Sequence, residues 1–170
     1  YYGSPAWTPP QLGSCPLWLP ARSAGTVADG AGVPSFPDLS GQGNTLVQAT
    51  ANLQPLYKVG GPNGKPYIQP DGVNDYLMSA VAGAVGLTGT SYTIWLVFNN
   101  PGTIAAGKTI LGLQIGDGAG TFRLSLAFTT ANLTNLDAVF SVTSGSWTAP
   151  AHSTNVWHSL IITYDWSAAA

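Results

Sequence analysis

The feature that most constrains this chain is how little charge it carries. Five lysines and arginines and seven aspartates are the charged side chains among 170 residues, and glutamate is absent. Lysine, arginine and glutamate normally cover the solvent-facing sides of helices, so material for amphipathic helices is scarce. The 21 glycines and 13 prolines favour short strands joined by tight turns. The composition therefore predicts one all-β domain.

The same composition excludes several functions. Without glutamate, neither a glutamate-based glycosidase pair nor a glutamate metal site can form. A net charge of −2 with five cations does not make a surface that tracks phosphates, so we expect no nucleic-acid partner. A serine nucleophile would need the G-x-S-x-G turn, which is missing. No apolar run reaches about 18 residues, so we expect no membrane insertion. We therefore expect a protein that is not an enzyme.

Alternating side chains in the second half predict regular strands. Segments 91–98, 109–115, 121–128, 138–142 and 156–164 show this pattern, and the glycine-rich segment 116–120 predicts a hairpin between two of them. Segment 91–98 is apolar on both faces, which predicts a strand buried on both sides, with Trp95 in the core; Trp157 is also expected there.

The first half is richer in turns. Residues 1–16 contain four prolines and three large aromatics and predict an extended arm that packs on its own domain or on a neighbour. Leu17–Leu19 could start the first strand, and shorter strands are expected at 45–48, 67–69 and 76–78. Asn63-Gly64 is the tightest turn signal, and residues 80–87 could form one helical turn. The domain is thus expected over residues 17–170.

Three segments in order resemble those of concanavalin A-like, laminin-G-like domains. They are Asp38-Leu39-Ser40-Gly41-Gln42-Gly43-Asn44, Asp71-Gly72-Val73-Asn74-Asp75-Tyr76-Leu77 and Trp157-His158-Ser159-Leu160-Ile161-Ile162-Thr163-Tyr164-Asp165. The resemblance implies an antiparallel two-sheet jelly-roll β-sandwich. In the family, further strands follow the last motif, so the sandwich is expected to lack its final strands here, and further sequence or a partner would supply them.

Exposed aromatic and amide side chains are the candidate binding residues. Trp147 and Trp166 lie in turn-rich sequence, and Asn99 and Asn100 follow a predicted strand. An exposed indole serves equally well to stack on a sugar ring or to anchor a protein interface, and the sequence does not separate the two. On the arm, the candidate interface residues are Tyr1, Tyr2 and Trp7.

The aspartates and histidines have mainly structural interpretations. Asp71 and Asp75 are expected to bind turn amides rather than to act as an acid pair. His158 is expected to be packed or hydrogen-bonded. No cofactor is required, although laminin-G-like folds can hold calcium, and Asp117 and Asp137 are then the candidate ligands.

The function expected from these features is non-enzymatic surface recognition. The low charge and the aromatic arm favour a structural component of a phage virion, such as a capsid decoration, fibre or tail protein, in contact with neighbouring subunits of an oligomer or assembly. The alternative is a carbohydrate-binding lectin or adhesin module that attaches to a cell-surface glycan. Either function places the protein on a virion or outside the cell.

Overall fold

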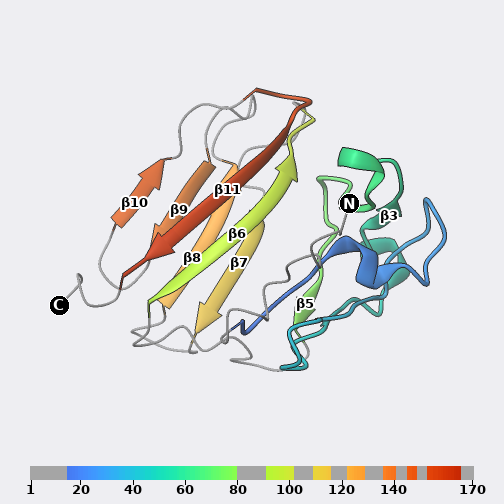
Figure 1. Cartoon of the computed structure of the whole chain (residues 1–170), viewed down its shortest axis with the longest axis horizontal. Helices are drawn as coiled ribbons and strands as arrows, with labels where there is room; N and C mark the ends of the chain where they lie inside the picture. Colours follow the sequence, from blue (N-terminus) through green and yellow to red (C-terminus); the bar gives the residue numbers. More distant parts are fainter. Residues whose placement is uncertain are drawn as a thin grey trace, which may run out of the picture. The chain divides into compact units, whose positions relative to one another are not determined.

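A computed structural model describes the chain over residues 15–79, 91–101, 109–115, 122–128, 136–140, 145–148 and 153–165. Among these residues the regular secondary structure is mostly strand, with three short 3-10 turns, and every strand pairing is antiparallel (Figure 1). The all-β class predicted from composition is therefore confirmed. Within the described residues, no helix is long and apolar enough to cross a membrane. The chain divides into two compact units, residues 1–85 and 86–170, each taken separately below.

The first unit is made of very short strands and turns. The strands are β1 (Ser35–Phe36), β2 (Leu46–Val47), β3 (Leu56–Lys58), β4 (Tyr67–Gln69) and β5 (Met78–Ser79). The 3-10 turns are η2 (Ala21–Ala24), η3 (Ala51–Leu53) and η4 (Pro62–Gly64). The strands form a three-stranded sheet in the order β1-β2-β5 and a separate β3-β4 pair. The expected strand at Leu17–Leu19 is wrong, because this segment has no regular structure and leads directly into η2.

A small apolar cluster holds this unit together. Val33 is completely buried and Ala24 is 1% exposed, while Phe36 and Tyr57 are 9% and 8% exposed. Partly buried side chains complete the cluster: Leu19, Val27, Leu46, Ile68 and Leu77. The backbone next to it is also paired, since the Val33 amide donates to the Pro55 carbonyl at 2.9 Å. Burial of these apolar side chains stabilises the first unit.

The β3-β4 connection confirms the turn signal at Asn63-Gly64. Asn63 has φ 51° and Gly64 has φ 70°, so both residues occupy the left-handed region that the Asn-Gly pair favours. We expect Gly64→Ala to lower the free energy of unfolding by about 1 kcal/mol, because a Cβ strains this conformation although no atom lies within 4 Å of it. Urea denaturation measures the change, and Gly64→Asn, which tolerates positive φ, should recover part of the loss.

The second unit contains the longer strands. They are β6 (Tyr92–Asn99), β7 (Thr109–Ile115), β8 (Phe122–Phe128), β9 (Leu136–Phe140), β10 (Gly145–Thr148) and β11 (Trp157–Tyr164). Four strands form one sheet in the order β10-β9-β8-β7, and β11 and β6 form a separate two-stranded sheet. The hairpin predicted around residues 116–120 is confirmed, since β7 and β8 are antiparallel neighbours. Strand β10 was not predicted, and the helical turn expected at 80–87 lies outside the described residues.

Candidate functional site

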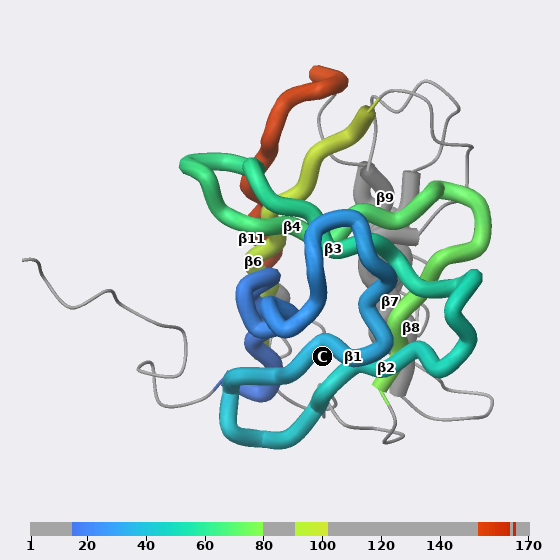
Figure 2. The backbone as a smooth tube through the Cα atoms, turned by 90° about the vertical axis from the view of Figure 1, so that its right-hand side faces the viewer, coloured from blue at the N-terminus to red at the C-terminus, as the bar shows by residue number. Residues whose placement is uncertain are grey.

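The pair of β6 and β11 presents one half-buried face and one open face. The two strands run side by side in register over all eight residues, from Trp157 opposite Asn99 to Tyr164 opposite Tyr92 (Figures 1 and 2). On the inner face of β6, Phe98 is buried and its neighbours are half-buried. The outer side chains are mostly exposed, so this pair is solvated on one side. The expected burial of residues 91–98 on both faces is therefore wrong.

Trp95 lies at the centre of the open face and is 60% exposed. Its indole Nε1 donates a hydrogen bond to Ser159 Oγ at 2.7 Å. Ser159 pairs in register with Val97, one outward position further along, while Trp95 itself pairs with Ile161. The hydrogen bond therefore joins Trp95 to a diagonal neighbour on the other strand, while most of the side chain stays exposed. The expectation that Trp95 lies in the core is wrong.

Apolar and hydroxyl side chains surround this ring. Ile161 is 63% exposed and Val97 is 53% exposed. At one end, Thr93 and Thr163 place their hydroxyl oxygens 3.4 Å apart. We call these outward residues the Trp95 face: Thr93, Trp95, Val97, Ser159, Ile161 and Thr163.

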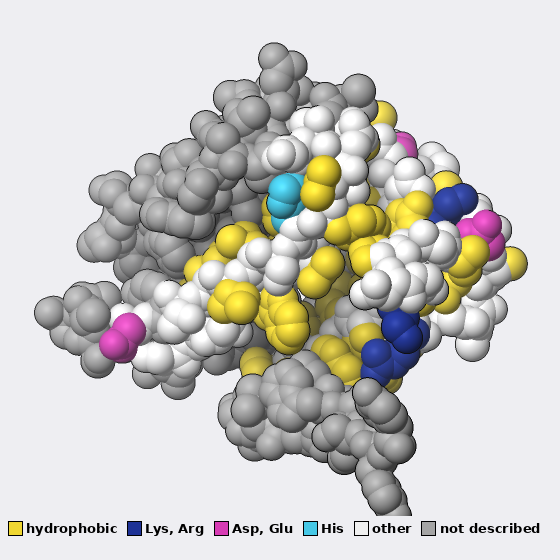
Figure 3. All heavy atoms as spheres, turned by 45° about the horizontal axis from the view of Figure 1, so that its top comes forward, with side chains coloured by type: hydrophobic (Ala, Val, Ile, Leu, Met, Phe, Trp, Pro, Cys, Tyr) yellow, Lys and Arg dark blue, Asp and Glu magenta, His cyan; other side chains and the backbone are white. Residues whose placement is uncertain are grey.

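No Asp, Glu, Lys or Arg occurs in β6 or β11, and His158 lies on the opposite face from Trp95. The nearest carboxylate in sequence is that of Asp165, which accepts a hydrogen bond from Ser91 Oγ at 3.0 Å beyond the strand ends. Figure 3 shows hydrophobic side chains at the surface of the face in view. A face of this kind suits an uncharged ligand, because it offers apolar contact and hydroxyl groups.

The two asparagines proposed for binding differ in how far they are buried. Asn99 is half-buried and has the same outward parity as Trp95, opposite Trp157 at one end of the pair. Asn100 is completely buried, and its carbonyl accepts a hydrogen bond from the Asn155 amide at 2.6 Å. Its burial argues against a surface contact by the Asn100 side chain, since the residue turns inward where the strand ends.

The other candidate residues lie mostly outside the described part of the chain. Trp147 is placed in β10 by its backbone, opposite Ala138, rather than in the turn expected from the sequence. Asp137 belongs to β9, where it pairs with Thr148 and Ala127. Outside the described residues lie Trp166, Asp117, Tyr1, Tyr2 and Trp7. Among the described residues, no group of three His, Cys, Asp or Glu side chains is arranged to hold a metal ion.

His158 has the structural role expected from the sequence. Its Nε2 lies 2.8 Å from the Ser153 carbonyl oxygen, and its ring centroid is 5.4 Å from that of Phe98. The neighbouring hydroxyl of Ser159 points to the opposite face, where it accepts from Trp95. The two side chains therefore do not form a nucleophile and base pair.

The aspartates of the first unit bind backbone amides. Asp71 Oδ1 accepts from the amides of Val73, Asn74 and Asp75 at 2.7, 3.2 and 3.4 Å, and Asp75 Oδ2 accepts from the Asp71 amide at 2.8 Å. The structural interpretation of this pair is confirmed. Like the capping of a helix end, such a turn satisfies amides that would otherwise lack partners.

Asp38 accepts hydrogen bonds at both of its carboxylate oxygens. Oδ1 accepts from the amides of Trp18 and Ser40, both at 2.9 Å, and Oδ2 accepts from Ser40 Oγ at 2.6 Å and the Asn44 amide at 3.0 Å. Partial burial raises the pKa of Asp38, but the hydrogen bonds from Ser40, Trp18 and Asn44 together outweigh it and leave the pKa lowered. The motif at 38–44 thus closes a loop in this structure.

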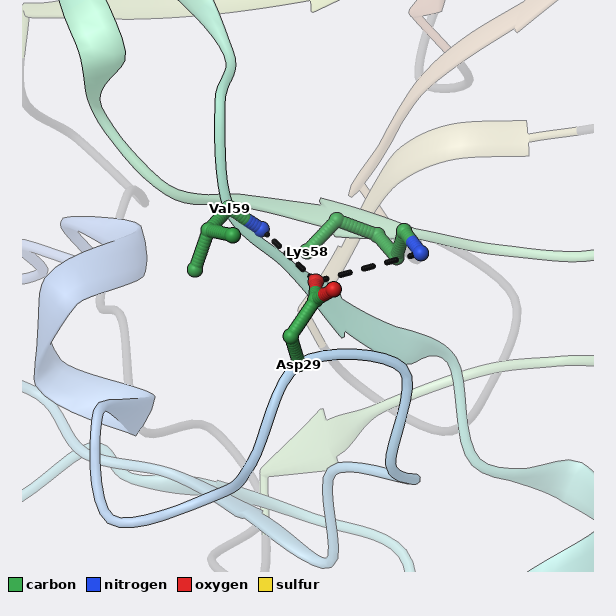
Figure 4. Close-up of polar contacts among 3 residues, drawn as sticks. All are labelled: Asp29, Lys58 and Val59. Carbon is green, nitrogen blue, oxygen red and sulfur yellow. Dashed lines mark hydrogen bonds and ion pairs between the residues drawn. The ribbon is translucent and has the colours of Figure 1, made fainter.

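Asp29 also accepts a hydrogen bond from a backbone amide, and it forms one ion pair. Its Oδ1 accepts from the Val59 amide at 3.0 Å and lies 3.8 Å from Lys58 Nζ (Figure 4). Half of the Asp29 side chain is exposed, so this ion pair contributes little to stability. Asp29 and Lys58 therefore hold a loop. Among the described residues, the Trp95 face is taken as the candidate site because it is an exposed apolar surface around a hydrogen-bonded indole.

No family model matches the sequence, and no curated protein or solved structure is detectably similar to it.

Proposed function

We propose that this protein is a non-enzymatic recognition module that contacts its partner through the Trp95 face. The observation that carries the proposal is the hydrogen bond from Trp95 to Ser159, which holds in place an indole that is 60% exposed. An ordered aromatic ring loses little conformational entropy on binding, and tryptophan is enriched among residues that dominate interfaces. Ile161 and Val97 extend the apolar area next to it.

The setting that we propose is a structural component of a phage virion, in contact with neighbouring subunits. The low charge of the chain and the three aromatics of the arm support an assembly subunit over a catalyst. For the fold, we propose a concanavalin A-like jelly-roll sandwich, in which the inner face of β6 and β11 packs on the four-stranded sheet. Its support is the antiparallel pairing throughout and the half-burial of the inner side chains.

Antibody labelling of intact particles tests this setting. A gold-labelled antibody raised against the chain should decorate the surface of virions purified from the source, and peptide mass spectrometry should find the chain at a fixed number of copies per particle. A chain recovered only from the particle-free fraction would contradict a virion role. The purified chain should also release no reducing ends from polysaccharides, and any protein-dependent release would contradict the non-enzymatic assignment.

Binding of a neutral glycan is the second candidate function. The flat indole of Trp95, with hydroxyl groups on Thr93, Thr163 and Ser159, is the combination that stacks on a sugar ring and bonds its hydroxyls. We expect a binder of this kind to be retarded in gels that contain a neutral polysaccharide, and Trp95→Ala to abolish the retardation. Val73→Ala changes a 69% exposed residue of the other unit and should leave it unchanged.

A further inference from the structure

We propose that the Trp95 face binds the proline- and aromatic-rich arm, residues 1–14, of a second copy of this chain. The inference rests on the proposed recognition function and names the partner of the same face. Residues 1–14 lie outside the described part of the chain, so the inference combines their sequence with the geometry of β6 and β11. Four observations support it: the size of the face, its chemistry, the exposure of its side chains and the anchoring of the arm's end.

The size of the face fits one extended segment. Eight residues of paired strand are about 26 Å long, and two strands are about 10 Å wide. A stable contact between globular partners needs about 800 Å² on each side, several times this area. Eight residues of polyproline II helix span about 25 Å, which matches the length of the pair. The face therefore suits a single extended chain better than a folded domain.

The chemistry of the arm matches that of the face. Residues 1–14 contain no Asp, Glu, Lys or Arg, and neither do β6 and β11. The arm carries Pro5, Pro9 and Pro10 around Trp7, a composition that favours the polyproline II conformation. Proline-rich segments in this conformation dock on flat aromatic side chains, because their shape is formed in advance and little entropy is lost. Trp95, held by Ser159, supplies such a side chain.

The assembly role proposed above favours an arm from another copy. The side chains of the face that such an arm would contact are exposed: Trp95, Val97 and Ile161 are 60%, 53% and 63% exposed. The point from which the arm leaves is fixed, since Asn44 Nδ2 donates to the Pro16 carbonyl at 2.7 Å. Two copies that exchange arms form a closed dimer, and copies that each bind the arm of the next form rings or filaments.

Two complementary variants of the full chain test the inference. Sedimentation velocity should show concentration-dependent association of the unmodified chain. Trp95→Ala removes the docking ring and Trp7→Ala removes the arm's aromatic anchor, so each alone should associate at least about 30-fold more weakly. An equimolar mixture should recover a 1:1 complex, because one variant keeps the arm and the other keeps the face. Val73→Ala is the control and should associate normally. Thermal unfolding confirms that each variant is folded.

Other outcomes overturn the inference in distinguishable ways. Normal association of Trp7→Ala with loss in Trp95→Ala would show that the faces meet each other or another site. A chain that stays monomeric at all concentrations, with polysaccharide retardation lost in Trp95→Ala, would assign the face to a glycan and leave the recognition function standing. Association that survives in both variants would place the contact elsewhere. A folded chain that neither associates nor binds polysaccharide, and is missing from particles, would overturn the proposed function as well.

Discussion

Replacing Phe36 by alanine is expected to lower the free energy of unfolding by about 3–5 kcal/mol. Phe36 is 9% exposed and belongs to the small cluster formed with Ala24, Val33 and Tyr57. Removing the ring loses its transfer free energy and leaves a cavity that two-residue strands such as β1 cannot easily close. A single small domain is stable by about 5–15 kcal/mol, so this loss is a large share of the total.

Urea denaturation followed by circular dichroism measures the effect. Leu39→Ala is the matched control, since Leu39 lies three residues away and is 40% exposed, so its truncation should change the free energy of unfolding by less than about 1 kcal/mol. Phe36→Leu fills part of the cavity and should recover a substantial part of the loss. A change below that of Leu39→Ala would contradict the view that this cluster holds the first unit together.

Periodicity explains which elements the sequence could predict. Strands β6, β8 and β11 have seven or eight residues, long enough for alternation to stand out, and each was placed within one residue of its bounds. The strands of the first unit have two or three residues, which is too short for the alternation of apolar and polar side chains to be recognised. There the turns carried the information, as the predictions of the Asn63-Gly64 turn and the β4 strand show.

The candidate site was harder to predict because both faces of β6 are apolar. Trp95 and Val97 read as core residues in β6 alone. The decisive signal lies in β11, where the residues that pair on the same side include Ser159 and Thr163. Register cannot be read from one strand, and shifting it by one residue exchanges the faces. The burial of Asn100 was invisible for a similar reason, since it depends on where the chain turns after β6.

Asp38→Asn is expected to lower the free energy of unfolding by about 2 kcal/mol at neutral pH, although it preserves the shape of the side chain. The remaining Oδ1 still accepts from the amides of Trp18 and Ser40. The new amide group replaces Oδ2 and cannot accept from the Asn44 amide, so this donor is left facing another donor. Asp29→Asn is the matched control, because Asp29 accepts from one backbone amide and is half exposed. We expect it to cost less than about 1 kcal/mol.

The pH dependence separates the charge of Asp38 from its shape. In the folded chain the pKa of Asp38 lies below the ordinary value of 3.8. The carboxylate therefore stabilises the fold fully when the pH is above the pKa that Asp38 has in the unfolded chain. This contribution is lost as the pH falls from the unfolded pKa through the folded one. The gap in stability between the unmodified chain and Asp38→Asn should thus be constant at neutral pH and shrink in acid. A gap that stays constant into acid would mean that the lost acceptor alone explains the variant, and that the carboxylate charge contributes nothing to closing the loop at 38–44.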